Sequence, residues 1–189
     1  MSAPETLYPS RADAGRFGTR PTPAFMLSHP AHVFALGFGS GLSPLAPGTS
    51  GTLWAWLTFW CLSPWMNEVL WGYTLLACTV LGWWACAVTA RHMGVLDPGS
   101  IVWDEVVAFW FVLWLLMPAS FAQQAAAFVL FRFFDAAKPG PVGWADSLFH
   151  GLDVDSERWP WAKAGWGIML DDLVAAGCTL LVMALWRAW

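Results

Sequence analysis

Charged residues are scarce in this chain, and their scarcity excludes several classes of protein. Only 12% of the 189 residues are charged, whereas a soluble domain carries about a quarter. The nine lysines and arginines form no run and the net charge is −4, so the sequence lacks the basic surface by which proteins bind nucleic acid. Cysteines are few and lack the paired spacing of a zinc site. We expect buried thiols at Cys61, Cys78, Cys86 and Cys178.

Apolar residues are abundant instead, and their distribution predicts membrane helices. They make up 58% of the chain and include 16 tryptophans, a residue type that favours the membrane interface. Only the stretch over 69–90 reaches by itself the roughly 20 residues needed to cross a bilayer. Pro118 divides another stretch, because proline interrupts helical hydrogen bonding. We therefore expect an all-α, polytopic membrane protein with about five short membrane helices, over 53–62, 69–90, 102–117, 121–135 and 173–186.

The polar segments of the chain set the expected domain limits and orientation. Residues 1–27 predict a disordered tail, which leaves 28–189 as one membrane-embedded domain. With five helices, Arg187 falls alone on one side of the membrane, and the positive-inside rule makes the other side cytoplasmic. The basic residues on that side are Arg11, Arg16, Arg20, Arg91, Arg132, Lys138, Arg158 and Lys163.

A glycine-rich segment precedes the first predicted helix. Residues 37–52 hold too many Gly, Ser, Thr and Pro residues for a regular helix, so we expect a re-entrant or cytoplasmic loop that leads into a helix near Thr52. Glycine lets the backbone approach a ligand, and amides at a helix start suit an anion. A kinked turn without a ligand is the alternative. The candidate phosphate-binding residues in this loop are Ser40, Gly41, Ser43 and Thr49.

Two pairs of neighbouring carboxylates, Asp104-Glu105 and Asp171-Asp172, are each expected to open an apolar helix on the cytoplasmic side. Capping accounts for one acid of a pair, since the helix dipole favours negative charge at the N-terminus, but capping does not require two. Neighbouring acids repel each other unless a cation or a proton offsets their charge. The two pairs therefore predict a Mg²⁺ site, because this ion prefers oxygen ligands and commonly binds together with phosphates.

Basic residues complete the predicted site. Arg132 and Asp135 are three residues apart and so share a helix face, and a charge at the end of an apolar helix is usually functional. Arg132 and Lys138 suit phosphate oxygens. A structural ion pair with Lys138 at the membrane interface is the alternative. Together with the glycine-rich loop, the acids and bases predict phosphoryl chemistry.

These motifs, in this order, resemble the phosphatidylglycerophosphatase A family. The resemblance spans roughly residues 28–180 and rests on 37–53, 99–105, Phe131-Arg132 with Asp135, Lys138-Pro139, His150-Gly151 and 167–172. It implies magnesium-dependent hydrolysis of phosphatidylglycerophosphate to phosphatidylglycerol and phosphate, in glycerophospholipid biosynthesis at the bacterial inner membrane. The chain departs from the family in its N-terminal tail and in 152–166, which we expect to be a loop insertion.

The resulting hypothesis gives each candidate a role. Asp104, Glu105, Asp171 and Asp172 hold Mg²⁺, with Asp135 as a further catalytic acid and possible fifth ligand. Arg132, Lys138 and the 40–49 loop hold the phosphate of the lipid. Either an activated water or one carboxylate attacks phosphorus, and the oligomeric state stays open. The alternative is an ion-coupled transporter that uses the same acids, although transporters usually carry internal repeats and midplane sites, and we find no such repeat.

Overall fold

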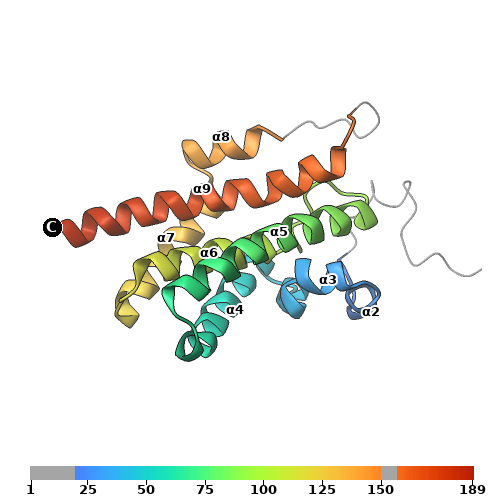
Figure 1. Ribbon diagram of the computed structural model, residues 1–189. Helices are drawn as coiled ribbons and strands as arrows, with labels where there is room; N and C mark the ends of the chain where they lie inside the picture. Colours follow the sequence, from blue (N-terminus) through green and yellow to red (C-terminus); the bar gives the residue numbers. More distant parts are fainter. Residues whose placement is uncertain (1–19, 150–156) are drawn as a thin grey trace, which may run out of the picture.

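The computed structural model describes residues 20–149 and 157–189, and every regular element in this part of the chain is helical (Figure 1). The all-α class is therefore confirmed, and each of the five predicted helices has a counterpart. These counterparts are α4 (Pro47–Leu62), α5 (Glu68–Met93), α6 (Trp103–Leu116), α7 (Phe121–Ala137) and α9 (Pro160–Ala188). The short elements are α2 (Pro23–Leu27), α3 (Pro30–Ala35), η1 (Gly37–Leu42), η2 (Ser63–Trp65) and α8 (Pro141–Ser147).

Helix α6 forms the centre of the bundle. It packs against α4, α5, α7 and α9, as expected of a helix that is apolar on nearly every face. Two tryptophans fasten it to its neighbours: Trp110 Nε1 donates to the carbonyl of Ala55 on α4 at 2.8 Å, and Trp103 Nε1 donates to the carbonyl of Cys78 on α5 at 3.1 Å. The first turn of α6, which carries two of the candidate acids, is thereby held inside the bundle.

Helices α5 and α9 are the two described helices that are long and apolar enough to cross a membrane. At ~1.5 Å per residue, α5 is about 39 Å long and α9 about 44 Å, whereas α4, α6 and α7 are about 21–26 Å. Val69, Tyr73, Leu76 and Val80 are each more than half exposed and follow one another at helical spacing along one face of α5. An apolar face of this length is suited to lipid and supports association with a membrane.

The N-terminal region contains more helix than predicted. Residues 23–27, expected to end a disordered tail, form α2, and the Thr22 side chain caps it by accepting a hydrogen bond from the backbone N–H of Phe25 at 3.1 Å. Helix α4 begins at Pro47 rather than near Thr52, because proline suits the first position of a helix. Residues 1–19, which include Arg11 and Arg16, lie outside the described part of the chain.

Helix α9 also begins earlier than predicted, at Pro160, so the expected loop insertion over 152–166 is helical from that residue onward. Two glycines in its first half are sites of close packing against neighbouring segments. A Cβ on Gly165 would lie 2.8 Å from the carbonyl oxygen of Trp83, and one on Gly167 would lie 2.8 Å from Phe149 Cβ. His150, Gly151 and residues 152–156 lie outside the described residues.

Candidate active site

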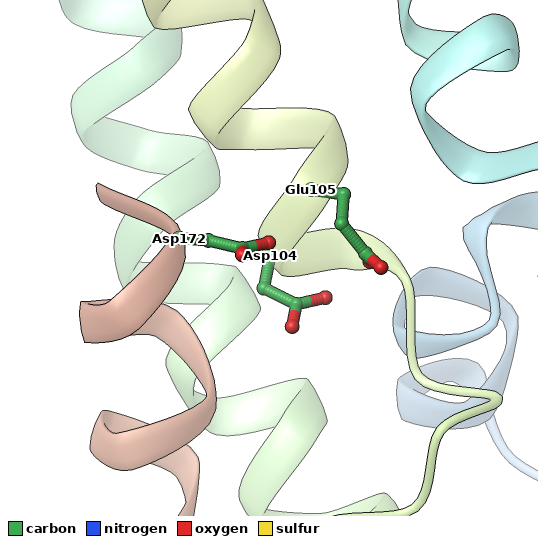
Figure 2. Close-up of side chains that lie close together, drawn as sticks. All are labelled: Asp104, Glu105 and Asp172. Carbon is green, nitrogen blue, oxygen red and sulfur yellow. The ribbon is translucent and has the colours of Figure 1, made fainter. Parts of the chain in front are cut away.

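Acids that are far apart in the sequence meet where the start of α6 lies against the middle of α9. Asp104 and Glu105 lie in the first turn of α6, as predicted. Asp171 and Asp172 do not open a helix, which corrects the prediction: they lie about three turns inside α9, because that helix starts at Pro160. Figure 2 shows the side chains of Asp104, Glu105 and Asp172 converging. Each of these three offers one oxygen, and the three oxygens all lie within 4.8 Å of one another.

Several carboxylate oxygens at this site have no hydrogen-bond partner among the described residues. Asp104 Oδ1, Glu105 Oε2, Asp171 Oδ1 and Asp172 Oδ2 are buried and have no hydrogen-bond partner among the described residues. A buried acceptor without a donor is costly, and clustered carboxylates repel one another unless a cation or proton offsets their charge. Hard oxygen donors in this arrangement fit a divalent cation such as Mg²⁺. The donor set around Asp104, Glu105 and Asp172 is therefore suited to a metal ion.

Arg132 approaches the same acids from α7. It forms an ion pair with Asp135 one turn further on, and its Nη1 lies 3.6 Å from Glu105 Oε1 and 3.4 Å from Thr52 Oγ1. The predicted shared face of Arg132 and Asp135 is confirmed. The Asp135 side chain also interacts with Asp172, so the ion pair of Arg132 and Asp135 borders the carboxylate cluster. The guanidinium of Arg132 is thus held at the edge of the cluster.

The first turn of α4 forms another wall of the site. A Cβ on Gly48 would lie 2.3 Å from Glu105 Oε1 and 3.0 Å from both terminal nitrogens of Arg132, so any larger residue would displace the ends of these side chains. Backbone N–H groups in the first turn of a helix have no partner within the helix, and this turn carries Gly48 and Thr49. The positive end of α4 therefore lies beside Glu105 and Arg132, an arrangement that favours an anion.

The other candidates in the glycine-rich segment make local contacts. Ser40 Oγ donates to the carbonyl of Gly37 at 2.9 Å, and Ser43 Oγ donates to the carbonyl of Leu45 at 2.7 Å. A Cβ on Gly41 would lie 2.1 Å from the carbonyl oxygen of Ser100, so this glycine lets η1 pack against the segment that leads into α6. The four loop candidates therefore lie in two different places. Thr49 lies in the first turn of α4, whereas Ser40, Gly41 and Ser43 lie in or directly after η1.

Lys138 is shared between two carboxylates from different helices. Its Nζ donates to Asp171 Oδ2 at 2.6 Å and also to Asp146 Oδ1 on α8. Burial by itself lowers the pKa of Lys138, but the hydrogen bonds to Asp146 and Asp171 outweigh burial and raise this pKa above its usual range. Asp146 was not among the predicted residues. The signal for it is the Pro139-Gly140-Pro141 turn, which folds the chain back so that a polar residue shortly after it returns to Lys138.

Comparisons with known proteins show what the chain as a whole is similar to. The family model for phosphatidylglycerophosphatase A matches residues 33–187. The chain is 42% identical over 149 residues to phosphatidylglycerophosphatase A of Escherichia coli. These 149 residues cover 79% of this chain and 78% of the relative. It is 36% identical over 169 residues to the protein of the same name from Haemophilus influenzae, covering 89% and 96%. A relative from Bacteroides thetaiotaomicron, 35% identical over 82% of this chain and 92% of its own length, is named provisionally as a phosphatidylinositol-3-phosphatase. No solved structure matches the chain.

Proposed function

The chain belongs to the phosphatidylglycerophosphatase A family, and from this premise we propose that it hydrolyses the phosphomonoester of phosphatidylglycerophosphate and leaves phosphatidylglycerol in the membrane. The observation that carries the proposal is the set of buried carboxylate oxygens, without donors among the described residues, beside Arg132 and the first turn of α4. Such a site joins a cation-binding half to an anion-binding half. The names of the relatives favour this hydrolase over the ion-coupled transporter that uses the same acids.

Asp104, Glu105 and Asp172 are the residues that would hold Mg²⁺, because one oxygen of each lies within 4.8 Å of the others, and each acid has a buried oxygen without a hydrogen-bond partner among the described residues. When bound, the ion would neutralise charge on the phosphate oxygens, as metals do in phosphoryl transfer. Asp171 is the sequence neighbour of Asp172, but its Oδ2 accepts a hydrogen bond from Lys138. We therefore separate Asp171 from the three ligands, although the sequence placed all four acids together.

Arg132 and the start of α4 would hold the phosphate, whereas Lys138 donates to Asp146 and Asp171. Arg132 presents a planar guanidinium that suits two phosphate oxygens, and the N–H groups around Thr49 add the positive end of a helix. Hydrolysis breaks the P–O bond to the glycerol, forms a P–O bond to the oxygen of water, and moves one proton from that water to the departing glycerol oxygen. Asp171 Oδ1, buried and without a donor among the described residues, is the acceptor that we assign to carry this proton.

The same residues suggest how the enzyme sits in the bacterial inner membrane. We infer five membrane helices, α4 to α7 and α9, with the active site facing the cytoplasm. Arg187, the one basic residue predicted on the far side, donates hydrogen bonds to the carbonyls of Leu116 and Pro118. Arg132 and Lys138 lie at the opposite end of α7 from that connection. This separation agrees with the asymmetry of basic residues that orients membrane proteins.

The test is phosphate release from phosphatidylglycerophosphate in detergent micelles, with Mg²⁺ and with a chelator. Wild type is compared with Asp171→Ala and with Glu157→Gln. Glu157 is a matched control, because it too pairs with a lysine, Lys163, near the start of α9. We expect magnesium-dependent release from wild type and the control, and none from Asp171→Ala. Folded wild type that releases no phosphate contradicts the proposal. Faster release from phosphatidylinositol 3-phosphate would transfer the proposal to that lipid.

A further inference from the structure

Lys138 donates hydrogen bonds both to Asp171 in the active site and to Asp146 on α8. Asp146 lies outside the set of acids that would hold the metal or the proton. An ammonium group has three N–H donors, and two of them are directed at these two carboxylates. We propose that Asp146 is a positioning residue: it holds Lys138 in place, and Lys138 in turn holds Asp171. This inference rests on the proposed function, since it concerns how one acid of that site is oriented.

The connection between α7 and α8 is a tight turn that brings the start of α8 close to the end of α7. Lys138 ends α7 with φ of 45°, in the left-handed region that residues other than glycine rarely adopt. A Cβ on Gly143 would lie 2.5 Å from the carbonyl oxygen of Lys138, so glycine is needed for α8 to fold back this tightly. Val142 and Ala145 are fully buried, and α8 packs against α9. Asp146 therefore contacts Lys138 from a helix, α8, whose backbone is held in place by packing against α9.

The two oxygens of Asp171 have different surroundings, and Lys138 causes the difference. Oδ2 accepts a hydrogen bond from Lys138 at 2.6 Å, whereas Oδ1 is buried and has no donor among the described residues. A fixed partner on one oxygen orients the other, in the way that outer partners orient metal ligands. A lysine side chain held by one carboxylate instead of two regains rotamer freedom. Loss of the Asp146 carboxylate is thus transmitted to Asp171, although Asp146 itself touches no substrate.

A double-mutant cycle tests this chain of contacts. Asp146→Asn and Lys138→Met are made singly and together, and kcat, KM and the thermal midpoint are measured for each, with Glu157→Gln as the control. We expect Asp146→Asn to lower kcat about 10- to 100-fold, the effect typical of lost outer partners, with KM and the thermal midpoint nearly unchanged. In the Lys138→Met background the same substitution has no lysine to act through, so it should change kcat by less than about twofold.

The outcomes separate this inference from the proposed function. Phosphate release by wild type is measured first, and its absence overturns both. If wild type is active, the inference is overturned when Asp146→Asn keeps wild-type kcat, when the two substitutions multiply, or when Asp146→Asn lowers the thermal midpoint without lowering kcat of the folded protein. If Asp146→Asn does not fold, the double variant decides. Activity equal to that of Lys138→Met supports the inference, and activity tenfold lower or more overturns it.

Discussion

Replacement of Gly48 by alanine is the sharpest test of how closely the first turn of α4 is fitted to the acids. Alanine is favoured over glycine within a helix by about 1 kcal/mol, so the backbone itself gains from the change. The new Cβ would lie 2.3 Å from Glu105 Oε1 and 3.0 Å from both terminal nitrogens of Arg132. The Glu105 oxygen must retreat by about 1 Å to restore an ordinary contact. The clash falls on the ends of two side chains, so it disturbs the site more than the fold.

A misplacement of about 1 Å costs about 100-fold in rate, equivalent to about 2.7 kcal/mol of transition-state stabilisation. We therefore expect Gly48→Ala to lower kcat/KM for phosphatidylglycerophosphate by about that factor, with a thermal midpoint close to that of wild type. Gly177→Ala is the matched control, because this glycine lies within α9 and a Cβ there would have no described atom within 4 Å. The reasoning is refuted if Gly48→Ala keeps a third or more of wild-type kcat/KM, or if it loses activity only by unfolding.

Three further substitutions test other parts of the site and the fold. Asp172→Asn should abolish magnesium-stimulated release and keep or raise the thermal midpoint, since it neutralises one of several clustered buried acids; turnover above a tenth of wild type with an unchanged metal requirement would exclude Asp172 as a ligand. Arg132→Lys keeps the charge but loses the planar fork, so KM should rise about tenfold or more while the protein stays folded; an unchanged KM would contradict the phosphate-binding role. Burial lowers the pKa of His32, so the folded protein binds fewer protons at this residue than the unfolded chain, and stability should fall as the pH drops below about 6.5. The thermal midpoint should fall less between pH 7.5 and pH 5.5 in His32→Gln than in wild type. An equal fall in both proteins would show that His32 is not the source of this pH dependence.

The five longest helices and most of their ends were predictable from the sequence, because these features depend on neighbours along the chain. The uncharged run over 69–90 became the core of α5. The break at Pro118 separated α6 from α7, and Ser120 with Gln123 forms a capping box that starts α7. The predicted pairing of Arg132 with Asp135 was also local, since residues three apart on a helix share a face. The same patterns pointed to α9, but they missed its start, because the Asp171-Asp172 pair predicts the beginning of a helix, whereas these acids lie buried inside α9.

Which candidate residues lie together depends on the packing of the helices and could not be predicted from the sequence. Asp171 and Asp172 are neighbours in sequence, but successive residues on a helix point about 100° apart. Asp172 therefore joins Asp104 and Glu105, whereas Asp171 pairs with Lys138. The direction in which each acid points depends on how α9 is rotated against α6, and packing between distant segments sets that rotation. Asp146 and Gly48 acquire their places in a similar way, because their partners lie on other helices or at the ends of other helices.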